Sequence, residues 1–353
     1  MRWLSVASEA LRNIVTGTSR LAWGVALLAV LVGGPAIAEQ AALLGAQHQA
    51  QQYRDSGAAI QVLSSDAVDG GRCDALRTMP GITAAGARRE AGTVRVTAMP
   101  SRDLTVHEVT PGFIHVIAGP DAVPDAGVWL PGPLADTLGA AAGTELDTSR
   151  GPMRVAGVFP WPDDGRPAVL DSAIVAPVPA IGSFDACWAF AWPADGAAKP
   201  YLYLAVAPGA DGASAVGALN TRLGETFDLD AVVAGRLTTL AAAVAAVLGA
   251  GIGGALVYGR RLEIASNLHA GVPRSAVVMQ ALLEVLACVA GAGVLLAGVT
   301  LAHVVAYPDA AVMWTWGAGM RVVGAGLAGT VLGGAIAVMG VRERHLFRFF
   351  RQR

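Results

Sequence analysis

Four long apolar runs are the feature that most constrains this chain. They occupy residues 21–38, 231–257, 276–306 and 312–341, and each is close to or above the roughly 20 residues that a helix needs to cross about 30 Å of hydrocarbon. Only 15% of the 353 residues are charged, whereas about a quarter are charged in a soluble protein. The sequence therefore predicts an α-helical membrane protein with four transmembrane helices.

The long segment between the first two runs has a different pattern. The first helix is expected to continue beyond the membrane as a stalk, so that helix and stalk occupy residues 21–50. Residues 51–230 then mix strand-like alternation with helix-like stretches, which predicts an α/β domain inserted between transmembrane helices 1 and 2. Within it we expect strands at residues 113–118 and 201–207 and a helix at residues 213–227.

Basic residues mark one side of the membrane. They precede the first run, lie between the second and third, and follow the fourth: Arg2, Arg12, Arg20, Arg260, Arg261, Arg274, Arg342, Arg344, Arg348, Arg351 and Arg353. Because basic loops stay in the cytoplasm, both termini, residues 258–275 and the basic tail at residues 342–353 are expected there, and the α/β domain is expected to be extracytoplasmic. An Ala- and Gly-rich composition with the single lysine Lys199 indicates a GC-rich bacterial genome, so we expect a multi-pass protein of a bacterial cell membrane.

The start of the chain allows two interpretations. Residues 1–20 gather apolar side chains on one helical face, which predicts an amphipathic helix in the membrane interface. Ala36-Ile37-Ala38 has the form of a signal-peptidase site, and cleavage there would remove the first run. The length of the amphipathic start favours a retained helix.

The sequence lacks the common catalytic, phosphate-binding and metal-binding motifs. The sequence contains no phosphate-binding loop, GxSxG elbow, HExxH pair or CxxC motif. We therefore expect no catalytic, metal or cofactor-binding residues on this chain, and a formal charge of −2 gives no reason to expect nucleic acid as a partner. Cys73 and Cys187 fall in the domain expected outside, where oxidation is permitted, so a disulfide and two separate buried thiols both remain open.

Two ionisable residues inside the apolar runs are expected to have a partner or a role. Glu284 and Arg321 are ionisable groups in or at the ends of spans, where such groups are costly; for Glu284 a structural contact and a functional role are both open.

Small residues at four-residue spacing let helix backbones approach closely, and they recur in the second and fourth runs: Ala241, Ala245, Gly249, Gly253, Ala325, Gly329, Gly333 and Ala337. These stripes predict packing faces, either within the chain or against a second copy.

Residues 258–284 form a polar hinge between the second and third runs. Gly271-Val272-Pro273 forces a break, and Ser275 is expected to cap the helix that follows. The result is a short helix that projects into the cytoplasm and is shaped to dock on another protein. The residues expected to couple it to that partner are Arg260, Arg261, Glu263, Ile264, Leu268, Gly271, Pro273 and Arg274.

This hinge resembles the coupling segment of MacB-like and FtsX-like permeases of type VII ABC transporters. The matching residues are Arg260-Arg261, Glu263-Ile264-Ala265, Leu268, Ala270-Gly271 and Leu282-Leu283-Glu284, with departures at Asn267, His269 and Pro273. Weaker likenesses follow in order along the chain, including VTPGFIHVIAG and GPMRVAGVFPWP in the extracytoplasmic part. The arrangement of one span, a large outer domain and three further spans is also similar to this family.

The resemblance implies partners that the chain itself does not supply. They are an ABC ATPase dimer, which holds the ATP and Mg, a second permease copy or paralogue, and an unknown extracytoplasmic cargo or enzyme. It implies mechanotransmission across the bilayer, with export of an amphipathic compound (a peptide, a haem-like molecule or a lipid) as the leading function. The alternative is a regulatory FtsX-like permease that activates an extracytoplasmic cell-wall enzyme. A membrane sensor without an ATPase is disfavoured by the hinge.

Overall fold

The computed structural model describes residues 3–16, 20–123, 126–209 and 213–342. The chain divides into two compact units. A helical unit comprises residues 1–47 and 230–353, and a sheet unit comprises residues 48–229. In chain order the sheet unit follows the first candidate span and precedes the second.

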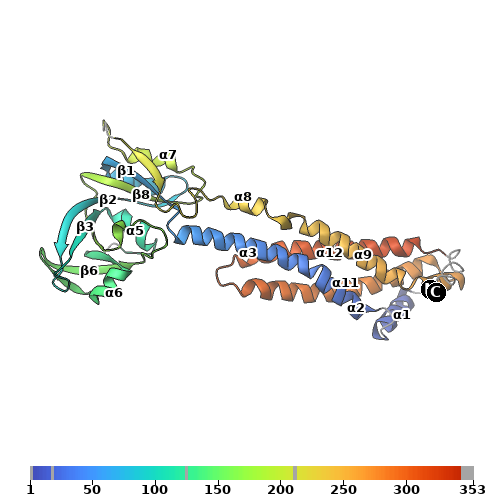
Figure 1. The fold of residues 1–353 in the computed structure, drawn as a ribbon. Helices are drawn as coiled ribbons and strands as arrows, with labels where there is room; N and C mark the ends of the chain where they lie inside the picture. The colour runs from blue at the N-terminus through green and yellow to red at the C-terminus, as the bar shows by residue number, and fades with distance from the viewer. Residues whose placement is uncertain (1–2, 17–19, 124–125, 210–212, 343–353) are drawn as a thin grey trace. The chain divides into compact units, whose positions relative to one another are not determined.

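Among its described residues, the helical unit contains four helices long and apolar enough to cross a membrane, as the sequence predicts. The first is a pair, α2 and α3, that breaks at Val32, and it is preceded by the shorter α1. Helices α9, α11 and α12 run alongside one another in this unit (Figure 1). The polar hinge contains α10, between the second and third candidate spans. The helix bounds are α1 (Trp3–Val15), α2 (Leu21–Leu31), α3 (Gly33–Asp55), α8 (Leu229–Ala234), η4 (Leu237–Leu240), α9 (Ala241–Tyr258), α10 (Arg261–His269), α11 (Arg274–Val305) and α12 (Val312–Gly340).

Glycines hold α9 and α12 together. A Cβ on Gly249 would overlap the carbonyl oxygen of Gly326, and one on Gly253 would overlap that of Thr330. On α12, Gly329 and Gly333 likewise lie against the backbone of α9. Only glycine permits backbones to approach this closely, so the small-residue stripes of the second and fourth runs pack against each other within one chain.

The sheet unit is built on one nine-stranded mixed sheet, in the order β5-β6-β4-β7-β3-β2-β8-β1-β9. The pairs β3–β7 and β4–β6 are parallel, and the other pairs are antiparallel. The strands are β1 (Ile60–Asp69), β2 (Ile82–Arg95), β3 (Asp103–Val109), β4 (Val128–Pro131), β5 (Glu145–Thr148), β6 (Gly151–Phe159), β7 (Ala173–Pro177), β8 (Ser183–Ala191) and β9 (Ala215–Ala218). Short helical segments lie between them: α4 (Gly70–Ala75), η1 (Leu76–Thr78), α5 (Pro111–Ala118), α6 (Gly132–Leu138), η2 (Ala168–Leu170), α7 (Lys199–Leu202) and η3 (Tyr203–Ala205).

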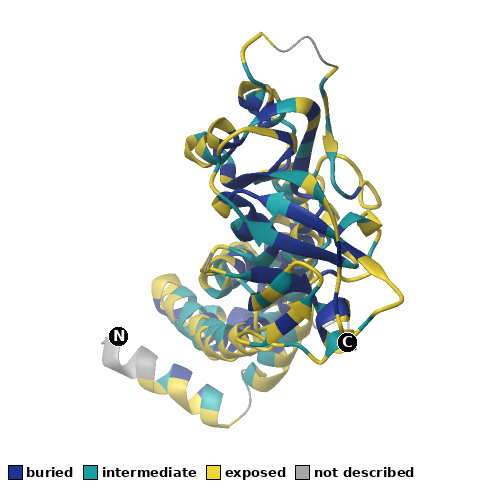
Figure 2. Ribbon diagram, turned by 90° about the vertical axis from the view of Figure 1, so that its left-hand side faces the viewer, coloured by how far each residue is buried: buried dark blue, intermediate teal, exposed yellow. Residues whose placement is uncertain are grey.

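Strand β8 divides the core of the sheet unit into two layers. Because successive side chains of a strand point to opposite faces, Ala186 and Trp188 join one hydrophobic cluster, which includes Phe113 of α5. Cys187 and Ala189 join the other cluster, on the face covered by α4. The strands accordingly carry long buried stretches, coloured dark blue in Figure 2.

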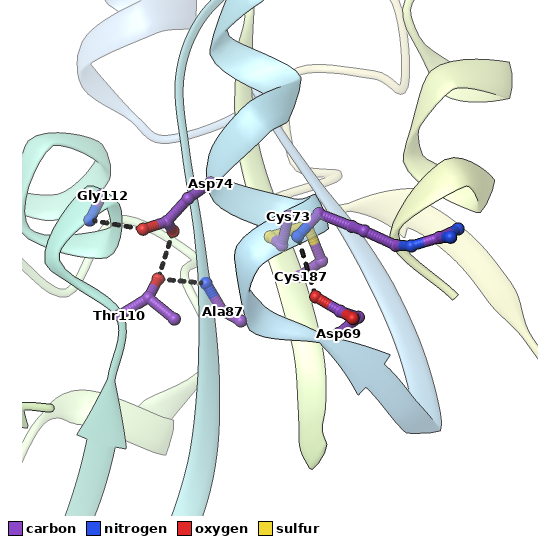
Figure 3. The surroundings of a disulfide bond; sticks show 8 residues. Asp69, Cys73, Asp74, Ala87, Thr110, Gly112 and Cys187 are labelled. Carbon is purple, nitrogen blue, oxygen red and sulfur yellow. Dashed lines mark hydrogen bonds between the residues drawn. A yellow bond between two sulfur atoms is a disulfide. The ribbon is translucent and has the colours of Figure 1, made fainter. Parts of the chain in front are cut away.

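A disulfide fixes α4 to strand β8, an interior strand of the sheet. Cys73 of α4 and Cys187 of β8 are bonded, with their Cα atoms 5.8 Å apart. Beside them, Asp69 caps α4 by accepting a hydrogen bond from the backbone N–H of Arg72, at 2.9 Å (Figure 3). The structure thus pairs the two cysteines for which the sequence left both possibilities open.

The prediction of a strand at residues 113–118 is wrong, because these residues belong to helix α5. Thr110 precedes the helix and Pro111 occupies its first turn, where the missing N–H costs nothing. The Asp74 carboxylate accepts hydrogen bonds from the Thr110 hydroxyl and, at 3.4 Å, from the N–H of Gly112 (Figure 3). Gly86 of β2 lets the helix backbone lie directly on the sheet.

Two further predictions in the sheet unit are wrong, and one strand was missed. Residues 201–207, expected as a strand, form the end of α7 and then η3, with Pro200 in the first turn of α7. Residues 213–227, expected as a helix, contain β9 instead. Strand β8 was not predicted, because it is buried on both faces and so lacks a polar alternation.

Candidate functional site

Helix α10 is defined by breaks at both ends. It begins after Arg260 and ends at His269, and Gly271 then turns the chain with a φ of +83°, a value that glycine adopts without strain. Helix α11 starts at Arg274 with Pro273 as its N-cap, and no side chain caps it. The prediction that Ser275 caps this helix is therefore wrong.

One face of α10 anchors it to the bundle. Ile264 and Ala265 are buried in a hydrophobic cluster with residues of α9, α11 and α12, and Leu268 is partly buried against it. These are the apolar positions that the sequence spaces at helical intervals. Ile264 and Leu268 are also among the residues predicted to couple to a partner; their side chains pack on the bundle, and the coupling role stays a prediction.

Arg260 joins α10 to Glu284 of α11. Its guanidinium donates to both carboxylate oxygens of Glu263, at 2.8 and 2.6 Å, and to one oxygen of Glu284. The side chains of Arg260 and Glu284 are 13% and 8% exposed, so this ion pair is shielded from solvent. The hydrogen bond to Glu263 is the largest cause that raises the pKa of Arg260, and the charge of Glu284 adds to it.

The second oxygen of Glu284 accepts a hydrogen bond from the side-chain amide of Asn13 in α1, at 2.8 Å. Asn13 is itself 7% exposed. A single carboxylate therefore connects the amphipathic α1, the start of α10 and the body of α11. We call Asn13, Arg260 and Glu284 the Glu284 bridge.

Two of the other predicted coupling residues make contacts within the helical unit. The guanidinium of Arg261 lies over the ring of Tyr258, 4.3 Å from its centroid. Arg274 donates to the carbonyl oxygen of Met339 at the end of α12, at 2.6 Å. Both arginines therefore brace the hinge against neighbouring helices.

The outer surface of α10 and of the turn that follows is exposed. Of the predicted coupling residues, Glu263, Gly271 and Pro273 lie there. Sequence reasoning missed Ser266, His269 and Ala270, which complete the same surface. The helical repeat could have found Ser266 and Ala270, because they stand three and seven positions after Glu263 on one face of a helix.

Arg321, the other membrane-embedded group singled out from the sequence, is exposed on α12. It lies near enough to Glu39 of α3 to interact with its charge. Glu39 is 4% exposed and binds the guanidinium of Arg236 through contacts of 2.7 and 3.1 Å. Sequence reasoning did not find this second buried ion pair, because its two members are 197 positions apart.

The described residues thus define a membrane protein with four apolar helices and a mixed α/β sheet domain. Among these residues no group of three or more His, Cys, Asp or Glu side chains is placed to hold a metal ion. The outer surface of α10 is exposed, while its opposite face and the Glu284 bridge join the hinge to the helical bundle.

No protein-family model matches the sequence, and no curated protein sequence matches it. Solved structures of transporter domains are similar to part of the chain. A domain of a putative permease from Porphyromonas gingivalis is 15% identical, covers 47% of this chain and 92% of its own, and has a TM-score of 0.34. The periplasmic region of MacB from Actinobacillus actinomycetemcomitans is 11% identical, covers 39% of this chain and 77% of its own, and has a TM-score of 0.29.

The extracellular domain of the noncanonic ABC-type transporter YknZ from Gram-positive bacteria is 14% identical, covers 41% of this chain and 92% of its own, and has a TM-score of 0.29. Identities of 15% or less and TM-scores of 0.34 or less are too low to assign an activity to this chain.

Proposed function

We propose that this chain is the permease subunit of an ABC transporter in a bacterial cell membrane. A separate ATPase dimer, which holds the ATP and Mg, docks on the outer surface of α10. Its closure is transmitted through the helical unit to the sheet unit on the opposite side. The observation that carries this proposal is a short helix, anchored by one face and exposed on the other, between two candidate spans.

Two observations support a location of α10 and the sheet unit on opposite sides of the membrane. Basic residues precede the first candidate span and lie around α10, which is the pattern of cytoplasmic segments. The sheet unit contains the Cys73–Cys187 disulfide, and disulfides persist in oxidising compartments. The cytoplasm therefore suits α10, and the extracytoplasmic side suits the sheet unit.

The internal contacts of the helical unit give a route for the movement. A push on α10 acts on Arg260, which holds Glu284 of α11, and Glu284 holds Asn13 of α1. Buried pairs of this kind move as a unit because separating them leaves charges uncompensated. Helix α9, which leads directly into α10, is locked to α12 by the glycine contacts.

The transport function that we propose is export of an amphipathic compound by a dimer of permeases, either two copies or a copy and a paralogue. A compound that is exported should stimulate ATP hydrolysis by the reconstituted complex. If instead an extracytoplasmic cell-wall enzyme binds the sheet unit and no compound stimulates hydrolysis, the regulatory alternative replaces export.

Docking on α10 can be tested by copurification in mild detergent followed by an ATPase assay. Ser266→Trp places a large side chain on the exposed surface of α10, where it displaces nothing inside the bundle. We expect an ABC ATPase to copurify with the wild-type chain and to be lost, together with ATP hydrolysis, from the Ser266→Trp variant. Ser101→Trp is the matched control, since Ser101 is an exposed serine of the sheet unit.

Each outcome of that experiment is informative. Both variants should remain folded and show the same unfolding temperature as the wild type. Equal amounts of ATPase with Ser266→Trp and with the wild type would contradict docking on α10. The absence of any ATP-hydrolysing partner from the wild-type complex would contradict the proposed class of protein.

A further inference from the structure

A groove lies on the helical unit, beside the first candidate span. This groove has a volume of about 720 Å³ and lies among α1, α2 and α9, with Ile14, Leu27 and Leu256 among its lining residues. Small-molecule sites have volumes of about 300–1,000 Å³, so the groove is large enough for a ligand. It is separate from the exposed surface of α10.

The lining is apolar except at one point. Arg20, which immediately precedes α2, is the only charged residue among those that line the groove. It is exposed and forms no ion pair with any residue that the structure describes. Its guanidinium lies close to the position that a Cβ on Gly259 would occupy, at the end of α9. A cation therefore stands at the rim of the groove, where α9 ends.

The surroundings of the groove are those of a membrane interface. Trp23 and Leu27 of α2 are 73% and 43% exposed, and Leu11 and Val15 of α1 are 62% and 79% exposed. Tryptophan is enriched at the boundary between hydrocarbon and headgroups, and amphipathic helices bury such an apolar face there. Exposed apolar side chains of this kind suit contact with lipid, and a cation beside them suits the headgroup region.

We propose that this groove binds one anionic phospholipid. An acyl chain lies along α2 and α9, and the phosphate accepts hydrogen bonds from Arg20, whose planar guanidinium matches phosphate oxygens. The charge complementarity selects an anionic headgroup, and the apolar lining selects a ligand with a chain. This inference rests on the membrane location of the helical unit and is independent of ATPase docking on α10.

An occupied groove would also hold α1 in place. Ile14 of α1 lines the groove, and the neighbouring Asn13 binds Glu284. The lipid would therefore stabilise the same helix that the Glu284 bridge holds from the other side. Lipid composition would in this way influence the position of α1.

Native mass spectrometry of the purified, delipidated full chain tests the site. The probes are phosphatidylglycerol and phosphatidylcholine with identical acyl chains, added in equal amounts. We expect the wild type to retain phosphatidylglycerol about fivefold over phosphatidylcholine, the ratio that corresponds to about 1 kcal/mol per basic residue near an anionic surface. Arg20→Gln should reduce that ratio to about one, because the shared acyl chains then provide the remaining affinity.

Two more variants make the result specific. Arg342→Gln removes another exposed arginine and should keep the wild-type ratio. Leu27→Trp fills the groove and should reduce the retention of both lipids. Equal retention of both lipids by the wild type, or an unchanged preference in Arg20→Gln, would overturn the proposal. It would also be overturned if the wild type is a dimer that Leu27→Trp converts to monomers without changing lipid retention, because the groove would then be an interface between two copies.

Discussion

Glu284 shows what a single buried carboxylate does for the hinge. The sequence identified it as an ionisable group in an apolar run, but its partners could not be predicted. They lie 24 and 271 positions away, at Arg260 and Asn13, and only the packing of three helices brings them together. The exposed positions of α10, by contrast, follow from the helical repeat alone.

Removing the Glu284 carboxylate should release α1. In Glu284→Ala the side chains of Arg260 and Asn13 lose a buried partner, which costs about 1–3 kcal/mol of unfolding free energy. Amide hydrogen exchange should become faster in α1, and thermal unfolding in detergent should begin at a lower temperature. Glu9→Gln is the control, because Glu9 forms an exposed pair with Arg12. Unchanged exchange in α1 of Glu284→Ala would contradict the bridge.

Because of His107, the stability of the sheet unit should depend on pH, and the direction of this dependence follows from the surroundings of the ring. The ring is 2% exposed; its neutral form donates from Nε2 to the carbonyl oxygen of Val169, at 3.2 Å, and Nδ1 lies 3.4 Å from the Arg88 guanidinium. Burial first, and then the charge of Arg88, lower the pKa of His107 below its ordinary value of 6.5. The unfolded chain therefore takes up a proton near that pH and the folded chain does not.

The stabilising contribution of neutral His107 is fully present above pH 6.5 and is lost as the pH falls through and below it, by up to about 1.4 kcal/mol per pH unit. Thermal unfolding of the sheet unit on either side of this pH should show the loss in the wild type and a smaller loss in His107→Gln. His48→Gln, at an exposed histidine, should behave as the wild type. An equal pH dependence in His107→Gln and the wild type would show that other groups cause it.

At the scale of elements, small residues decide how the membrane helices pair. The spacing of glycines and alanines predicted two packing faces, yet it could not tell whether these faces meet each other or a second copy. The structure places Gly253 and Gly333 in contacts between α9 and α12 of the same chain. Gly326, which the four-residue stripe omitted, belongs to the same contact, because real helix faces follow both the i+3 and the i+4 spacing.

A side chain at Gly253 should force α9 and α12 apart. Gly253→Val places a branched side chain against the carbonyl oxygen of Thr330, and such overpacking costs about 1–3 kcal/mol. Gly251→Val is matched in helix and in chemistry, but no atom lies within 4 Å of its added Cβ. The unfolding temperature should therefore be lower in Gly253→Val and nearly unchanged in Gly251→Val. Equal unfolding temperatures for the two variants would contradict the close α9–α12 contact.

The sheet elements show where sequence patterns fail. Helix α5 and strand β8 are continuous apolar segments, and a short buried run fits a strand and a helix equally well. Only the tertiary contacts of Asp74 with the start of α5, and of Cys187 with Cys73, distinguish them.

At the scale of the whole molecule, the sequence predicted the number of apolar helices and the α/β character of the inserted segment. These properties follow from composition and periodicity along the chain. The order of strands in the sheet, the disulfide partner and the Glu284 bridge depend on contacts between distant positions, which one sequence does not encode in a readable pattern. The described residues thus form a bundle of apolar helices, a disulfide-linked sheet unit and a short helix, α10, whose outer surface is exposed.

The permease function proposed for this chain depends on α10 and the sheet unit lying on opposite sides of the membrane. Labelling of intact cells with a membrane-impermeant thiol reagent measures this directly, in a Cys288→Ala background that leaves the Cys73–Cys187 disulfide in place. Ser101→Cys, in the sheet unit, should be labelled in intact cells, and Ser266→Cys, on α10, only after the membrane is permeabilised. Labelling of both positions in intact cells, or of neither, would contradict a permease that couples an ATPase on one side to a domain on the other.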